Sequence, residues 1–180
     1  MKIGLIILGI CGLVYFSNIS AEVGVLDSTN IVTDYNCPID ATTCDLSSQD
    51  ITSITADAFI NHTSLVTLNL SSNQISSIDS TTFNGLSSLS GLDLSSNAIS
   101  SLEMDDFAGL PQLEELYLQY NSISTIETDA FNGLSNLRIL YLYGNGITSL
   151  EVGDFNGLPK LQQLSLDSNG IGYIDPMAFE

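Results

Sequence analysis

Residues 113–123 read LEELYLQYNSI, and the same form, LxxLxLxxNxI, recurs along the chain at a spacing of 24 residues. The asparagines of this form are Asn73, Asn97, Asn121, Asn145 and Asn169. A second apolar column keeps the same phase and consists of Phe59, Phe83, Phe107, Phe131, Phe155 and Phe179. A fixed period of this length is typical of repeat units that stack and share one core.

Each repeat predicts one short strand. In Leu116-Tyr117-Leu118 the alternation places both leucines inside and the tyrosine outside. The spacing leaves room for a crossover on the far side, so the strands are expected to stack in parallel. A single repeat buries too little apolar surface to offset its ordering entropy, and the units therefore fold only as an array. We interpret the asparagine column as structural, because a buried amide needs backbone partners.

This pattern resembles the leucine-rich-repeat family in its 24-residue form, which is common in extracellular proteins, and the resemblance covers residues 41–180. It implies an α/β fold, a solenoid curved into a horseshoe arc with parallel β-strands on the concave face and an irregular or short helical convex side. It also implies a module that recognises a protein or a glycan through the concave face.

The first residues have the layout of a signal peptide. The charge of Lys2 precedes an apolar run from Ile3 to Phe16, and small polar residues follow. We predict cleavage after Ala21, and hence a signal peptide at 1–21 and a secreted or extracellular chain. A retained membrane anchor is the lesser alternative, because a span usually needs about 20 apolar residues. Residues 22–36 are interpreted as an N-terminal linker.

Signal cleavage removes Cys11 and leaves Cys37 and Cys44, an even pair that predicts a disulfide in an oxidising compartment. Residues 37–64 resemble a shortened form of the cysteine cap that precedes extracellular leucine-rich repeats, merged with a first degenerate repeat. Residues 65–180 hold the other repeats, the last of them incomplete. We expect either a fragment of a longer chain, anchored in a membrane if a span follows, or an end that pairs with another chain.

The charge balance argues against several classes of function. Lys and Arg total 3 against 21 Asp and Glu, a formal net charge of -18, which repels phosphate backbones and argues against a nucleic-acid partner. His62 is the only histidine, so the sequence offers no convincing zinc site and implies no cofactor. Since no nucleophile motif or phosphate loop is present, the chain is not expected to be an enzyme.

The outward strand positions favour one binding patch. Early repeats carry small polar residues there, including Gly91, which offer little anchoring area. The two following repeats bring large side chains typical of binding hot spots. The predicted ligand-binding residues are Glu115, Tyr117, Tyr120, Arg138, Tyr141 and Tyr143. Two alternatives stay open. Leu-Tyr-Leu is a common form of this repeat, so Tyr117 and Tyr141 can be present for that reason alone. Arg138 can also pair with Glu114 or Glu115 across strands without a ligand role.

Acidic residues gather after each strand's turn, from Asp57 to Asp175. We interpret them as a solvated convex or side surface that keeps the array soluble. Calcium binding is the alternative, and it would be weak because no calcium-loop motif is present. Sequons at Asn61 and Asn69 predict glycosylation, and sugar on Asn69 would direct a ligand toward the tyrosines. The leading function is a secreted or cell-surface binding module, such as the start of a receptor ectodomain. The alternative is an acidic structural protein of the extracellular matrix, weakly calcium-binding.

Overall fold

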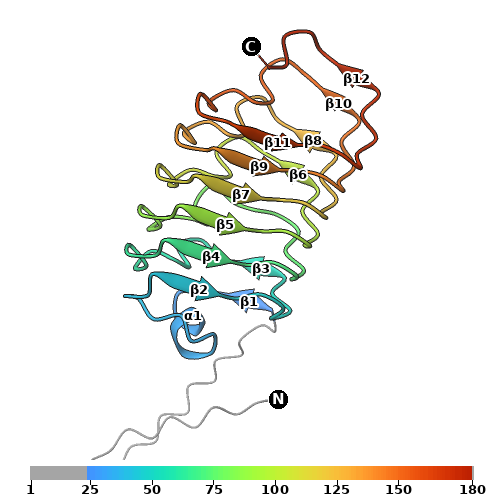
Figure 1. The fold of residues 1–180 in the computed structure, drawn as a ribbon. Helices are drawn as coiled ribbons and strands as arrows, with labels where there is room; N and C mark the ends of the chain where they lie inside the picture. Colours follow the sequence, from blue (N-terminus) through green and yellow to red (C-terminus); the bar gives the residue numbers. More distant parts are fainter. Residues whose placement is uncertain (1–23, 180) are drawn as a thin grey trace, which may run out of the picture.

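A computed structural model describes residues 24–179, so the predicted signal peptide at 1–21 lies outside the described residues. The described chain winds into a stack of turns, each of which contributes one strand to a long sheet (Figure 1). The solenoid expected from the 24-residue period is therefore confirmed.

The long sheet has six parallel strands, and each strand pairs with the next one along the chain. The register advances by one period at each step: Thr67 faces Gly91, which faces Glu115, which faces Ile139. The strands in order are β2 (Thr43–Asp45), β4 (Thr67–Asn69), β5 (Gly91–Asp93), β7 (Glu115–Tyr117), β9 (Ile139–Tyr141) and β11 (Gln163–Ser165). Residues one period apart are therefore immediate neighbours on this sheet.

Shorter parallel pairs form on the other side of the stack. They are β1 (Val25–Leu26) with β3 (Ser53–Ile54), β6 (Ser101–Leu102) with β8 (Thr125–Ile126), and β10 (Ser149–Leu150) with β12 (Tyr173–Ile174). The helix of the described part, α1 (Asn30–Thr33), has four residues and lies near the first turn. The sequence predicted a convex side that is either irregular or built of short helices. The side away from the long sheet is the irregular kind, with short strand pairs.

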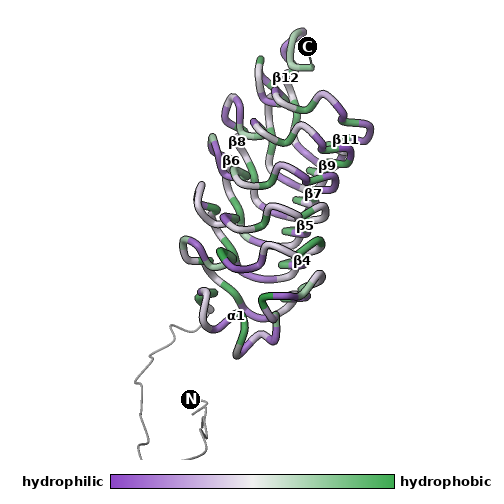
Figure 2. The backbone as a smooth tube through the Cα atoms, turned by 90° about the vertical axis from the view of Figure 1, so that its left-hand side faces the viewer, coloured by the Kyte–Doolittle hydropathy of each residue, from purple (hydrophilic) through white to green (hydrophobic). Residues whose placement is uncertain are grey.

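The core lies between these two sets of strands and runs the length of the stack. Leu116 and Leu118 are fully buried while Tyr117 between them is half-buried, as the alternation predicted. The phenylalanines stack ring upon ring, with centroids 5.9 Å apart between Phe107 and Phe131. Figure 2 shows apolar and polar stretches alternating within each turn. Each repeat thus buries its apolar residues against its neighbours.

The asparagine column connects each turn to the one before it. The Nδ2 group of Asn121 donates to the carbonyl oxygens of Leu94 and Leu118, both at 3.0 Å, and its Oδ1 accepts the backbone N–H of Ile99 at 3.1 Å. Asn73, Asn97, Asn145 and Asn169 make equivalent bonds. The structural interpretation of this column is confirmed, and one amide satisfies three backbone groups.

The first turn is covered by residues that precede the repeats. Leu26 in β1 and Ile31 in α1 are fully buried, so the described part of residues 22–36 is folded and differs from the linker that we expected. Its apolar residues do not follow the 24-residue columns, which is why the repeat pattern gave no sign of them. They shield the end of a core that would otherwise meet water.

Residues 24–45, which include the first strand of the long sheet, β2, form an N-terminal cap, and the predicted disulfide lies within it. Cys37 and Cys44 are bonded, with Cα atoms 5.5 Å apart. His62 is 1% exposed, and its Nε2 lies 3.1 Å from the carbonyl oxygen of Cys37. Because a carbonyl only accepts, Nε2 must be the donor. The histidine side chain therefore ties the cap to the first repeat, with its ring edge-on to Phe59 at 5.9 Å.

Two of the acids expected on a solvated surface are buried instead. Asp106 and Asp154 are 4% and 3% exposed, and they accept the backbone N–H groups of Glu103 and Glu151 at 2.8 Å. The expectation was wrong for these two because their column immediately precedes the buried phenylalanines. Burial raises the pKa of both carboxyls, that of Asp106 to about 6.

Asn121→Ala is expected to lower the free energy of unfolding by about 1–3 kcal/mol, because it leaves the N–H of Ile99 without a partner and removes one of the two amide donors to each of the Leu94 and Leu118 carbonyl oxygens. Asn132→Ala is the control, since Asn132 is exposed on a turn of the same repeat and surface changes usually stay within about 0.5 kcal/mol. Urea denaturation followed by circular dichroism measures both variants. Equal stabilities for the two would contradict the role of the amide column.

Asp106→Thr is expected to stabilise the fold at neutral pH. The equivalent Thr82 hydroxyl accepts the N–H of Asp79 at 3.0 Å, so threonine keeps this bond without a charge. Since the folded-state pKa of Asp106, about 6, lies above its usual value of 3.8, the ionised carboxylate destabilises the fold above that pH and the penalty fades as pH falls toward 4.

We expect the Asp106→Thr gain to be about 1–3 kcal/mol at neutral pH and to shrink steadily toward about pH 4. Urea denaturation of both proteins across this pH range measures the difference, and ionisations common to the two proteins cancel. A gain that does not depend on pH would show that the Asp106 carboxyl does not titrate there.

Candidate functional site

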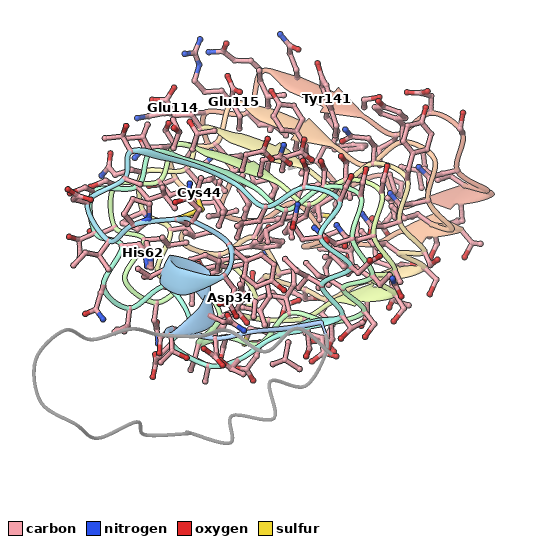
Figure 3. The ribbon with its side chains drawn as sticks, turned by 90° about the horizontal axis from the view of Figure 1, so that it is seen from below. Asp34, Cys44, His62, Glu114, Glu115 and Tyr141 are labelled. Carbon is pink, nitrogen blue, oxygen red and sulfur yellow. A yellow bond between two sulfur atoms is a disulfide. The ribbon has the colours of Figure 1, made fainter. Side chains whose placement is uncertain are left out.

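The outward side chains of the six-stranded sheet form one surface, which we call the sheet face. Seen along the stack, Glu114, Glu115 and Tyr141 stand out from the same edge of the molecule, while Cys44 lies within the ribbon (Figure 3). Strands β7 and β9 carry the large side chains of this face. The predicted ligand-binding residues lie in these two strands and directly beside them in sequence, with Arg138 just before β9 and Tyr120 and Tyr143 after the strands.

Four tyrosines form a continuous aromatic group on the sheet face, which we call the tyrosine cluster: Tyr117, Tyr120, Tyr141 and Tyr143. Tyr117 meets Tyr141 edge-to-face with ring centroids 5.4 Å apart. Tyr141 lies 6.0 Å from Tyr143, which meets Tyr120 at 5.1 Å. These separations and angles are those of favourable aromatic pairs. Residues from two repeats thus build one surface.

Tyr120 occupies a backbone position where the other repeats have small residues. Its φ is 59°, and the equivalent Ser72, Ser96, Gly144 and Ser168 also have positive φ. A non-glycine residue in this left-handed region costs about 1–2 kcal/mol. The tyrosine side chain is nevertheless 59% exposed, so core packing does not account for it.

Gly144 provides the space for the ring of Tyr120. A Cβ atom at Gly144 would come within 2.8 Å of Cδ1 of Tyr120, which is closer than two such atoms approach. Tyrosine at 120 and glycine at 144 are therefore matched across neighbouring repeats. The pairing lets the ring of Tyr120 lie close to Gly144 and meet Tyr143 edge-to-face.

Hydrogen bonds hold the two central tyrosines in place. The hydroxyl of Tyr117 donates to Oε2 of Glu115 at 2.8 Å, and that of Tyr141 donates to Oε1 of Gln163 at 3.2 Å. Partial burial, together with the bond to Glu115, raises the pKa of Tyr117 to about 12. Tyr117 is therefore neutral at physiological pH and presents a hydroxyl and an apolar ring.

Arg138 immediately precedes β9 and forms the ion pair with Glu114 that the sequence left open. Its Nη1 is 3.7 Å from Oε2 of Glu114, and its Nη2 donates to Oε1 of Gln162 at 3.2 Å. Both charged side chains are about half exposed, at 52% and 51%, so the pair contributes at most about 1 kcal/mol to stability. The guanidinium remains accessible at one end of the strand, and Tyr143 lies beyond the other.

The sheet face is hollowed on both sides of the Glu114–Glu115 pair. A hollow of about 440 Å³ lies over Gly91, and its lining includes Thr67, Asn69, Asp93, Glu115 and Tyr117. A smaller one of about 100 Å³ is lined by residues that include Arg138, Gln162 and Gln163. These hollows were not predicted from the sequence, in which Gly91 is only a residue with little anchoring area. The 24-residue register, which makes Gly91 a neighbour of Glu115, was the signal that could have found the larger hollow.

The family model described as leucine rich repeat matches residues 63–123 and 111–171, which together exceed half of the chain. The chain belongs to the leucine-rich-repeat family. One of 326 matching solved chains is the Toll-like receptor TLR13, from a crystal structure of a TLR13–ssRNA13 complex, with 28% identity and a TM-score of 0.67. The match covers 83% of this chain and 24% of the TLR13 chain. No curated protein matches the chain.

Other site predictions for this leucine-rich-repeat chain concern the first repeats. Asn61 is exposed, and Asn69 is half-buried in β4, where its Oδ1 accepts the N–H of Ser71 at 3.0 Å. Glycosylation of either asparagine stays a prediction. Across residues 24–179, no group of three or more His, Cys, Asp or Glu is arranged to hold a metal. No helix in this range has the length and apolar character of a membrane span.

Proposed function

We propose that this leucine-rich-repeat chain is a secreted or cell-surface binding module that recognises a protein or a glycan through the sheet face, the concave side expected for this repeat. The observation that carries the proposal is the tyrosine cluster, and above all Tyr120, a strained and exposed aromatic residue. The repeat turn imposes the positive φ in each repeat, so Tyr120 is singled out by its large exposed aromatic ring, which the fold does not require at this position.

The chemistry of the cluster suits a macromolecular ligand. Tyrosines bury large rigid areas at a low entropy cost and keep a hydroxyl for hydrogen bonding, which is why they dominate binding hot spots.

A location outside the cell is part of the same proposal. The disulfide between Cys37 and Cys44 fits an oxidising compartment, and the likeness to a Toll-like receptor fits an ectodomain. The predicted signal peptide at 1–21 would direct the chain there. Because the chain spans about a quarter of the TLR13 chain, a role as part of a receptor is also a proposal.

We further propose that the chain has no catalytic activity. Asp106 is the described carboxyl whose pKa is raised to about 6, and it is buried beside the phenylalanine column, away from either hollow. The acids on the sheet face surround shallow, open surfaces, whereas catalytic groups are usually tuned inside a pocket. The alternative of a calcium-binding matrix protein has no supporting observation in the described acids.

The TLR13 structure contains RNA, but the negative charges of the sheet face in this chain favour a partner other than nucleic acid. Of the three Lys and Arg residues in the chain, Arg138 lies on this face, and it is already paired with Glu114. Asp93 and Glu115 line the larger hollow. Phosphate groups would be repelled, and binding of RNA without several basic contacts would be weak.

Tyr120→Gly is expected to weaken binding without weakening the fold. Glycine relieves the positive-φ strain and loses one aromatic pair, two effects of similar size, so the free energy of unfolding should change by less than about 1 kcal/mol. Peptides from a random phage-displayed library and glycans from an array, selected on the unaltered protein, serve as probes. Their dissociation constants for the variant should rise by about tenfold or more.

Ser96→Gly is the matched control, because Ser96 has the same backbone conformation, with φ of 55°, one repeat earlier. It should leave the affinities unchanged. Tyr117→Ala combined with Tyr141→Ala tests the centre of the cluster in the same assay. Probes that keep their affinity for all the tyrosine variants would refute the assignment of the binding surface.

Single-stranded RNA should not bind this chain at physiological salt. Fluorescence anisotropy with a labelled oligonucleotide measures this directly, and reversing the charge of the face with Glu114→Lys and Glu115→Lys serves as the positive comparison. Saturable binding of RNA to the unaltered protein, weakened by Arg138→Ala, would overturn the proposed class of partner.

A further inference from the structure

The hollow over Gly91 lies next to the tyrosine cluster, and nothing in the fold requires the glycine that creates it. The φ of Gly91 is outside the left-handed region, and a Cβ atom there would meet Cγ2 of Thr67 at 3.8 Å, an ordinary contact. Glycine weakens a strand relative to other residues. A small side chain would fit this position, so the absence of one is what keeps the hollow open.

The walls of the hollow carry negative charge and an aromatic ring. Asp93 accepts the N–H of Ser95 at 2.9 Å through Oδ1, and Glu115 accepts the hydroxyl of Tyr117 through Oε2. Each of these bonds uses one oxygen of its carboxylate. Glu114, the third acid in the lining, is paired with Arg138. No basic residue belongs to the lining itself.

Tyr117 joins the hollow to the tyrosine cluster. It lines the hollow and also contacts Tyr141, so one ligand can occupy both features. A carboxylate pair beside a tyrosine ring attracts a cation by charge and by the quadrupole of the ring. The net charge of the chain, -18, adds a long-range attraction for a basic partner.

We propose that the hollow over Gly91 receives the cationic end of a lysine or arginine side chain from a protein partner, whose adjacent residues lie on the tyrosine cluster. This inference rests on the proposed function and deepens it by naming the chemistry of the partner. The hollow, about 440 Å³, has room for the aliphatic stem of such a side chain together with water. Asp93 and Glu115 accept hydrogen bonds from the cationic head, which makes them charge-assisted.

The test uses four random-peptide libraries that differ in one fixed central residue, which is Arg, Lys, Leu or Glu. Each library is passed over the immobilised protein at physiological salt, and the retained fraction is measured. The Arg and Lys libraries should be retained about tenfold more than the Leu and Glu libraries. Free arginine added at high concentration should compete for this excess.

Three variants separate the hollow from the general acidity of the chain. Gly91→Thr places a branched side chain on the floor of the hollow and narrows it without changing the charge, and the variant should melt at the same or a higher temperature because threonine favours strands. Glu115→Gln removes one charge from the hollow, while Asp45→Asn removes one charge from β2, outside the hollow lining. The Arg and Lys preference should disappear with the first two variants and persist with Asp45→Asn.

The outcomes distinguish the two proposals. A preference for Arg and Lys that survives in Gly91→Thr would come from net charge alone and would overturn the hollow as the site. Equal retention of all four libraries, lost in Tyr120→Gly, would overturn the cationic partner and leave the tyrosine cluster as the binding surface. If no library is retained, the protein partner itself is refuted, and the glycan array then decides the proposed function.

Discussion

The hydrogen-bonded side-chain amide of each repeat asparagine is the interaction on which the rest of the structure depends. A strand of three residues cannot hold its own position, and a crossover without helix leaves many backbone groups to be satisfied. The Asn121 side chain supplies a donor to each of two carbonyl groups and an acceptor for one N–H, in two successive turns. Because the same bonds recur at each turn, the spacing and register of the turns are fixed together.

Because the register is fixed, residues at the same position of successive repeats line up on one surface. Residues 24 apart in the sequence become side-by-side neighbours on the sheet face, as Tyr117 and Tyr141 do. The core columns hold mainly leucine, isoleucine and phenylalanine, whereas the outward positions are free of that constraint. The chain can therefore place tyrosines in two repeats and a glycine in a third without disturbing the stack. Recognition and folding are carried by different columns of the same repeat.

Much of this was predictable from the sequence, because the repeat columns are packing constraints. The Leu116–Leu118 alternation, the role of Asn121 and the pairing of Cys37 with Cys44 were predicted and confirmed. Features outside the columns were not predictable in this way. The fold of residues 24–36 follows no period, and the burial of Asp106 is an exception to the alanine or threonine in its column.

The sequence predicted which residues make up the candidate site, but not how their side chains contact one another. The sequence placed Tyr117, Tyr120, Tyr141 and Tyr143 on one face, and the structure adds their contacts. It also shows that Gly144 makes room for Tyr120 and that Arg138 pairs with Glu114. These details depend on side-chain conformations across neighbouring turns, which a pattern of residue types does not contain. The hollow over Gly91 is likewise a property of three strands together.

Fluorine NMR of the protein labelled with 3-fluorotyrosine tests the central claim most directly, because the chain carries its own controls. Tyr35 lies in the N-terminal cap and Tyr173 in the last short strand, both away from the sheet face. On titration with a library-selected peptide or an array-selected glycan, the resonances of Tyr117, Tyr120, Tyr141 and Tyr143 are predicted to shift while those of Tyr35 and Tyr173 stay in place. Shifts at Tyr35 or Tyr173 with the four cluster resonances unchanged would contradict the account.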